Sequence, residues 1–176
     1  MDKTKPYNYK NCSSLFGYSA KVHIRFKAQC QLCDCGGENP PNFDLWRQMT
    51  VEHLIGKSQG GYLKQIKQAV IHRFPQLSSN EIILLSEKID ELNTVSCCQF
   101  CNSTTCRDTS DISMYKLIEN GKDSKSILIS IEQSCKKILK EKQETVAWKL
   151  KFIREAFQNE VASKITNKYE ETNNLP

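Results

Sequence analysis

Two Cys-x-x-Cys pairs that lie far apart in the chain constrain its fold more than any other feature of the sequence. Cys30 and Cys33 form the first pair, Cys98 and Cys101 form the second, and Cys98 follows Cys33 by 65 positions. Two thiolates at this spacing can bind one metal ion, and two such pairs complete the tetrahedral four-sulfur site that suits zinc. Because four sulfurs leave no open position for water, we expect a structural zinc that joins distant segments.

Two other cysteines could replace one of the four predicted zinc ligands. Cys35 and Cys97 lie close enough in sequence to replace a predicted ligand, whereas ordinary thiol roles are expected for Cys12, Cys106 and Cys135. The total of nine cysteines is odd, and the N-terminus lacks the apolar core of a secretion signal. We therefore expect reduced, metal-binding thiols in the cytoplasm and no disulfide framework. No apolar run of about 18 residues indicates a membrane span, so a membrane is not an expected partner.

An apolar segment between the cysteine pairs leads into an acid–histidine pair. Residues 45–55 are predicted to be extended, Glu52 and His53 lie near the end of this segment, and a loop with Lys57 and Gly60–Gly61 follows. Neutral imidazole can accept a proton at physiological pH because its ordinary pKa is about 6.5. Carboxylate oxygens are ligands that Mg²⁺ prefers. An isolated Glu-His pair is usually incidental, so its meaning depends on the residues that accompany it.

The residues that accompany the pair resemble the HNH endonucleases, which belong to the ββα-metal nucleases. The family pattern has an acid-His pair ending a strand, a loop closing in Gly-Gly, an Asn five residues before a Cys, and Cys-x-x-Cys followed by His or Asn. The matching positions are Glu52, His53, Gly60, Gly61, Asn93, Cys98, Cys101 and Asn102. The resemblance covers residues 29–102, less than half of the chain, and several spacings agree at once.

The resemblance implies a role for each polar residue of the pattern. His53 would be the general base that activates water, and Asn93 would orient it. Glu52 and Asn102 would hold one catalytic Mg²⁺ or Mn²⁺, and the substrate would be a DNA phosphodiester cut to a 5′-phosphate and a 3′-hydroxyl. The acid of this pair is Glu where the family more often has Asp, so its carboxylate stands one methylene farther from the backbone. Restriction, phage defence and mobile elements all use this chemistry, and the sequence does not distinguish among them.

The distribution of charge also favours a nucleic-acid partner. Residues 1–75 contain 11 basic and 5 acidic residues, whereas residues 76–110 contain 2 basic and 5 acidic residues. A basic half of a domain is typical of proteins that bind polyanions, although a solvated basic surface has the same composition. The predicted DNA phosphate contacts are Lys21, Arg25 and Lys27, to which the resemblance adds Lys57 and Arg107.

The sequence predicts an α+β fold with a small ββα-metal core. The expected domains are a nuclease domain over 1–110, with a helical insertion at 62–92, and a helical C-terminal extension over 111–176. The insertion contains two apolar stripes with helical spacing, separated by Pro75 and by a capping box at Ser78–Glu81. Residues 93–97 are β-prone. Two further stripes, from Leu128 to Ile138 and from Val146 to Ile165, predict separate C-terminal helices.

The segment 16–28 permits two interpretations. Apolar residues alternate along it, which predicts a strand with the basic residues on its other face. Apolar residues at Leu15, Tyr18, Val22 and Phe26 also fit a helix, so both structures remain open.

A second class of function remains as an alternative. A zinc knuckle that binds nucleic acid without cutting would need the cysteines but none of His53, Asn93 and Asn102, whose joint presence favours the enzyme. Double-strand cleavage of a symmetric site would require a homodimer, and the sequence leaves the oligomeric state open.

Overall fold

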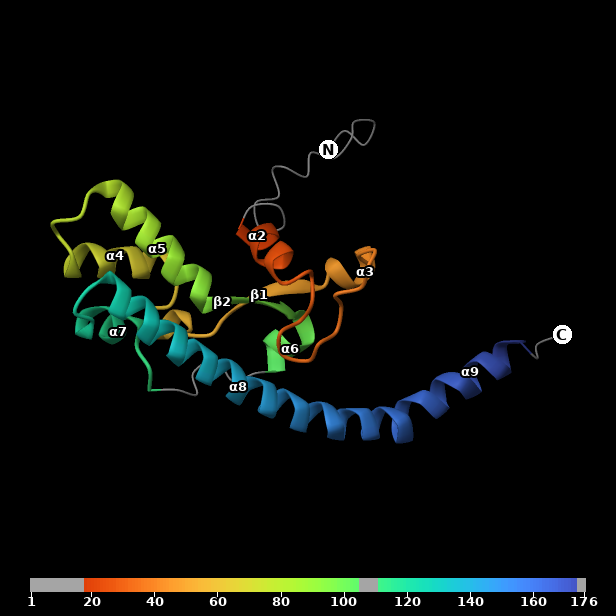
Figure 1. The fold of residues 1–176 in the computed structure, drawn as a ribbon. Coiled ribbons are helices and arrows are strands. Elements are labelled where there is room, and N and C mark those ends of the chain that lie inside the picture. Colours follow the sequence, from red (N-terminus) through yellow and green to blue (C-terminus); the bar gives the residue numbers. More distant parts are fainter. Residues whose placement is uncertain (1–17, 105–110, 174–176) are drawn as a thin grey trace, which may run out of the picture.

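Two short antiparallel strands lie at the centre of the fold (Figure 1). The computed structural model describes residues 18–104 and 111–173. Strand β1 (Met49–His53) pairs with β2 (Thr94–Cys98), and the register places Glu52 opposite Val95 and His53 opposite Thr94. Helix α6 (Gln99–Thr104) follows β2 directly and contacts both strands. The predicted α+β class is confirmed.

The N-terminal segment is helical, so the predicted strand within 16–28 is wrong and the helical alternative is right. Helix α2 (Tyr18–Arg25) packs on both β1 and β2 and buries Val22 and His23. The His23 Nδ1 atom lies 2.9 Å from the Ser96 hydroxyl oxygen. As part of a helix, Val22 and His23 both face the two-stranded sheet. In a strand, these neighbouring residues would point to opposite faces.

The extended segment predicted for 45–55 is shorter in the structure. Helix α3 (Phe43–Trp46) occupies its beginning, and β1 starts at Met49. The cause is local, because the Asn42 side-chain oxygen accepts hydrogen bonds from the backbone N–H groups of Asp44 and Leu45 and so caps the helix. The end of the extended segment, which carries Glu52 and His53, is a strand as predicted.

The insertion forms the two predicted helices, α4 (Leu63–Arg73) and α5 (Ser79–Asn93). The capping box is present: the Ser78 N–H donates to Glu81 Oε2 at 2.8 Å, and the Glu81 N–H donates to Ser78 Oγ at 3.4 Å. Because α5 ends at Asn93, its last residue enters β2 without a loop.

The C-terminal helices are fewer and longer than predicted. Helix α7 (Met114–Asn120) is capped by Ser113, and α8 runs without interruption from Ser124 to Ala156. The π-helix η3 (Phe157–Ala162) continues it into α9 (Ser163–Asn173). The two apolar stripes therefore lie on one continuous helix, which leaves the body of the molecule at its far end (Figure 1).

The insertion and the C-terminal region share one hydrophobic core. Buried apolar side chains from α4, α5, α7 and α8 pack together, and Leu54 and Ile55 from the loop after β1 belong to the same cluster. Complete burial of a side chain of this size stabilises a fold by about 1.5–3 kcal/mol. The residues beside the acid–histidine pair are thus fixed to the main core. Within 18–104 and 111–173, no helix is both long and apolar enough to cross a membrane.

Candidate active site and cysteine cluster

Four thiols come together beside the sheet. The sulfur atoms of Cys30, Cys33, Cys35 and Cys98 all lie within 4.8 Å of one another, and those of Cys33 and Cys98 are 3.8 Å apart. In a tetrahedral site with Zn–S bonds of about 2.3 Å, neighbouring sulfurs are about 3.8 Å apart. The cluster could therefore hold a metal ion such as zinc. It joins the segment before β1 to the end of β2.

The fourth thiol of this group is Cys35, whereas the sequence predicted Cys101. The Cys101 thiol lies close to the group, and burial together with the nearby Cys30 and Cys33 thiols raises its pKa. The Cys101 N–H also donates to Cys98 Sγ at 3.5 Å, the backbone contact of a knuckle. Hydrogen bonds from Cys97 and Cys98 lower the pKa of Cys30. A surplus of thiols thus surrounds the position that one ion would occupy.

Backbone contacts hold the first cysteine pair in place. The Cys30 N–H donates to the Cys35 carbonyl at 2.8 Å, and the neighbouring Gln31 N–H donates to the Ser96 carbonyl of β2 at 2.9 Å. The turn requires glycine at position 36, where φ is +82° and an added Cβ would lie 2.5 Å from the Ala28 carbonyl oxygen. This explains why glycine follows Cys35 directly.

Asn93 fixes the loop that follows His53. Its side chain is fully buried; the oxygen accepts from the Ile55 N–H at 2.7 Å, and the amide donates to the carbonyls of Ile55 and Gly61 at 3.0 and 2.9 Å. The loop passes so close that a Cβ at Gly61 would lie 1.7 Å from the Ile55 carbonyl oxygen, and the preceding Gly60 has φ +80°. The Gly-Gly pair is therefore a steric requirement of this contact.

The Asn93 side chain contacts the backbone of the loop after His53 and holds both ends of that loop, and its oxygen also accepts a hydrogen bond from Cys135 Sγ at 3.7 Å. The role of Asn93 in orienting His53 stays a prediction. Cys98 follows Asn93 by five positions, so β2 connects this anchor with the cysteine cluster.

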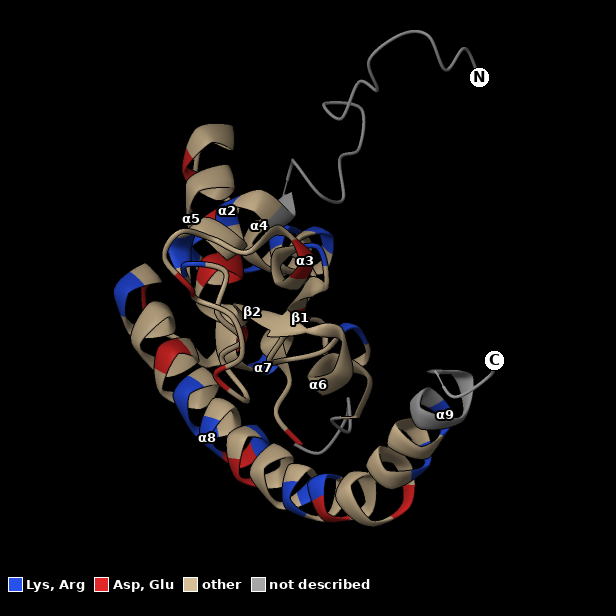
Figure 2. Cartoon of the chain, turned by 90° about the vertical axis from the view of Figure 1, so that its right-hand side faces the viewer, with Lys and Arg blue, Asp and Glu red and all other residues tan. Residues whose placement is uncertain are grey.

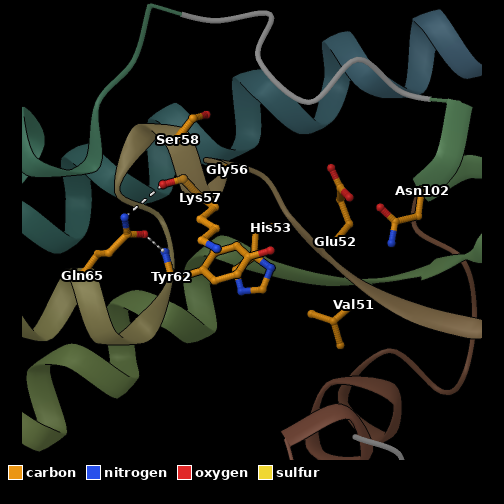
Figure 3. Close-up of a pocket in the computed structure, with 9 residues that line it drawn as sticks. All are labelled: Val51, Glu52, His53, Gly56, Lys57, Ser58, Tyr62, Gln65 and Asn102. Carbon is orange, nitrogen blue, oxygen red and sulfur yellow. Dashed lines mark hydrogen bonds between the residues drawn. The ribbon is translucent and has the colours of Figure 1, made fainter.

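A pocket of about 580 Å³ opens over the end of β1 (Figure 3). Its lining comes from four segments: β1, the loop that leads into α4, the first turn of α4, and α6. The lining residues are Val51, Glu52, His53, Gly56, Lys57, Ser58, Tyr62, Gln65 and Asn102. The structure therefore brings Glu52, His53 and Asn102 to one cavity, although 49 positions separate His53 from Asn102 in the chain. Lys57 extends over the same cavity.

His53 lies in the pocket wall with its ring stacked on Tyr62. The ring centroids are 4.2 Å apart and the planes are inclined by 27°. Burial lowers the pKa of His53 to about 4, because removal from water disfavours the imidazolium form. The imidazole is therefore neutral at physiological pH, which is the protonation state that a general base requires.

Asn102 presents its oxygen to the pocket. Its amide donates to Thr50 Oγ1 at 2.9 Å, and the Thr50 hydroxyl in turn donates to the Cys97 carbonyl at 3.0 Å. Since the nitrogen is engaged away from the cavity, the side-chain oxygen points toward Glu52 (Figure 3). Two hard oxygen donors, a carboxylate and an amide carbonyl, thus face each other.

Glu52 makes a contact that the sequence patterns did not reveal. The carboxylate is buried, and its Oε1 atom accepts a hydrogen bond from Lys142 Nζ of α8 at 2.5 Å. Lys142 is buried to the same degree, so the two charges compensate each other away from water. A signal existed, because Lys142 lies at helical spacing between the apolar Ile138 and Val146 and so falls on the buried face of α8.

The predicted phosphate contacts are distributed over the surface. Lys57 lines the pocket, whereas the Arg25 guanidinium donates to the Thr94 carbonyl and lies 3.7 Å from Glu91. Lys21 and Lys27 are exposed on and after α2, outside the lining of this pocket. Arg107 lies outside the described residues.

No protein-family model, curated protein or solved structure matches the chain. Arguments about function therefore rest on the site itself.

Proposed function

We propose that this protein is a metal-dependent DNA endonuclease of the HNH type. The observation that supports this most is the convergence of Glu52, His53 and Asn102 on one pocket whose loop is held by Asn93. These residues are recruited from β1, the end of α5 and α6, so a shared cavity is not a consequence of sequence proximity.

The proposed reaction follows from the protonation state and position of His53. The neutral imidazole takes a proton from a water molecule that attacks the scissile phosphorus, and general-base catalysis of this kind is typically worth about 10²–10⁴ in rate. Stacking on Tyr62 holds the ring at a fixed angle to the cavity. Lys57, at the exposed edge, binds a phosphate oxygen of the substrate.

Glu52 and Asn102 fit a divalent cation by their donor chemistry. Mg²⁺ and Mn²⁺ prefer carboxylate and amide oxygens and retain several water ligands, which a pocket of about 580 Å³ can accommodate. A bound cation would supply positive charge for the phosphorane-like transition state and the leaving 3′-oxygen. Lys142 already engages Oε1 of Glu52, so Oε2 is the carboxylate oxygen assigned to the cation.

We further propose that the cysteine cluster binds one structural zinc. Cys30, Cys33 and Cys98 belong to both the predicted set and the clustered set, and either Cys35 or Cys101 supplies the fourth sulfur. Four thiolates leave zinc no open position, so its role is to hold the N-terminal knuckle against β2.

The activity is tested with supercoiled plasmid, with Mg²⁺ or Mn²⁺ against EDTA. His53→Ala should abolish nicking while zinc content and helicity stay unchanged. His72→Ala is the matched control, because this histidine lies on α4 with its ring beside Tyr115 and outside the pocket lining. Cleavage by His53→Ala at the wild-type rate would contradict the proposal. Sequencing of the cleaved ends tests separately for 5′-phosphates.

A second candidate is a zinc-knuckle protein that binds nucleic acid without cutting it. The Glu52–Lys142 ion pair favours it, because a carboxylate that is already neutralised attracts a cation less strongly. Such a protein would shift the mobility of DNA with a steep dependence on salt, but would give no nicked product with any divalent ion.

A further inference from the structure

One face of the long C-terminal helix changes from buried to exposed along its length. Over the first two thirds of α8, the residues on this face are buried: Ile127, Ile131, Cys135, Ile138, Lys142 and Val146. The same spacing continues with Leu150, Ile153, Phe157, Val161 and Ile165. The second half of the helix extends away from the body, as Figures 1 and 2 both show.

The π-helix keeps these residues in line. Four-residue spacing drifts around an α-helix, which has 3.6 residues per turn, but the wider turn of η3 between Phe157 and Ala162 compensates the drift. Ile153, Phe157, Val161 and Ile165 consequently form one apolar stripe, and each side chain is 42–47% exposed.

A helix of this kind needs a partner for its apolar face. Isolated helices are marginal in water, and helices in proteins gain most of their stability from packing of an amphipathic face. Residues 150–173 span about 36 Å at 1.5 Å per residue, with a face about 10 Å wide. At these dimensions two such helices in contact bury roughly 360 Å² each, or about 720 Å² in total, which is below the 1,200 Å² of stable interfaces and in the range of weak, transient complexes. A second copy could therefore cover the stripe with weak affinity.

The sequence of this helix is complementary to itself in the antiparallel direction. Glu160 and Lys164 are both exposed, lie four positions apart and flank the stripe on the same side. An antiparallel pair centred on Val161 places Glu160 of each chain near Lys164 of the other. It also places Phe157 against Ile165 of the second copy. A parallel pair would place Glu160 beside Glu160 and Lys164 beside Lys164.

We propose that the chain forms a two-fold homodimer through antiparallel pairing of the α8–α9 helices at Val161. A two-fold interface uses the same surface on both subunits, which the symmetric spacing of Ile153, Phe157, Val161 and Ile165 provides. The dimer is independent of the proposed nuclease activity, because the stripe lies outside the pocket lining and the cysteine cluster.

The test is sedimentation velocity of the full zinc-loaded chain from about 1 to 100 µM, the range in which a small interface is expected to dissociate. The expected species at the high end has twice the chain mass of 20.2 kDa. Val161→Asp, which opposes two carboxylates on the two-fold axis, should raise the dissociation constant by at least about a hundredfold. Added NaCl should weaken the dimer, because the contacts between Glu160 and Lys164 are between opposite charges.

Asn159→Asp is the matched control, since it adds the same charge to the opposite, exposed side of the same helical turn. It should dimerise as the wild type does, with zinc content and helicity equal in all three proteins. Ile165→Asp is a second variant that should dissociate the pair. A wild-type monomer across the whole range would overturn the proposal. So would a dimer that persists in Val161→Asp, or one that added NaCl strengthens, because screening relieves the like-charge contacts of a parallel pair.

Discussion

Lys142 Nζ and Glu52 Oε1 form a buried ion pair at 2.5 Å, which ties the long helix α8 to the strand that carries the candidate catalytic residues. The two residues are 90 positions apart. The ion pair fixes the distance between β1 and α8, so the geometry of the pocket depends on a residue that does not line it.

Removing the lysine should destabilise the protein strongly. Lys142→Met leaves the Glu52 carboxylate buried without its cation, and breaking a buried pair in this way typically costs about 3–5 kcal/mol. The double variant Lys142→Met/Glu52→Gln should recover most of that loss. Urea unfolding at pH 7 measures both, with Lys140→Met as an exposed control on the same helix. A loss below about 1 kcal/mol in the single variant would contradict a compensating role.

Asn93→Ala should disorder the loop after His53. The substitution leaves the Ile55 N–H and the carbonyls of Ile55 and Gly61 without the side chain that binds them. Each unsatisfied buried group costs about 1–3 kcal/mol. Because three groups lose their partner, we expect the free energy of unfolding to fall by about 3 kcal/mol or more. Hydrogen exchange should show faster exchange of the Ile55 amide than in the wild type. Unchanged protection of that amide would refute the anchoring role.

The stability of the protein should fall between pH 6.5 and pH 4 in a way that depends on His53. The unfolded imidazole takes up a proton below its ordinary pKa of 6.5, whereas burial lowers the pKa of His53 to about 4 in the folded protein. The unfolded state therefore binds more protons in this window, and the free energy of unfolding decreases as pH falls through it. The loss should be about 3 kcal/mol, because one pKa unit corresponds to about 1.4 kcal/mol.

His53→Phe tests this assignment, because it retains an aromatic ring beside Tyr62 and cannot titrate. Its urea-unfolding stability should depend less on pH than that of the wild type over the same window. His23, whose pKa burial also lowers, is retained in both proteins and so cancels from the comparison. Equal pH dependence of the two proteins would count against a buried, neutral His53.

Zinc content should identify the fourth ligand of the cysteine cluster. The purified wild-type protein is expected to contain one zinc per chain, and Cys98→Ser should lose it together with much of the thermal stability. We compare Cys35→Ser with Cys101→Ser, and the variant that loses zinc identifies the fourth ligand. Cys135→Ser serves as a control outside the cluster. Metal-free wild-type protein would rule out the zinc proposal.

Features encoded locally could be predicted from the sequence. The capping box at Ser78 and the apolar spacing within 62–92 gave α4 and α5, because both signals act within a few residues. The position of Asn102 just after the second cysteine pair brought it to one cavity with Glu52 and His53, because β1 pairs directly with β2 and α6 follows β2.

Features that depend on tertiary contacts could not be predicted in this way. The segment from Tyr18 to Arg25 fits both a strand and a helix, and the sheet surface it covers decides between them. The Glu52–Lys142 pair requires knowledge of how α8 crosses the sheet. The continuity of α8 was missed because the polar residues between Ile138 and Val146 resemble a connection, although Lys142 among them is buried.

The unbroken helix from Lys142 to Val161 also sets a fixed distance. Val161 follows Lys142 by 19 positions, which corresponds to about 28 Å of helix axis. In the proposed antiparallel dimer, two such lengths lie end to end and separate the two Glu52–Lys142 pairs by roughly 55 Å. That distance corresponds to about 16 base pairs of B-form DNA. A dimer of this design would address two well-separated stretches of duplex, and paired nicks close together on opposite strands would need a different assembly.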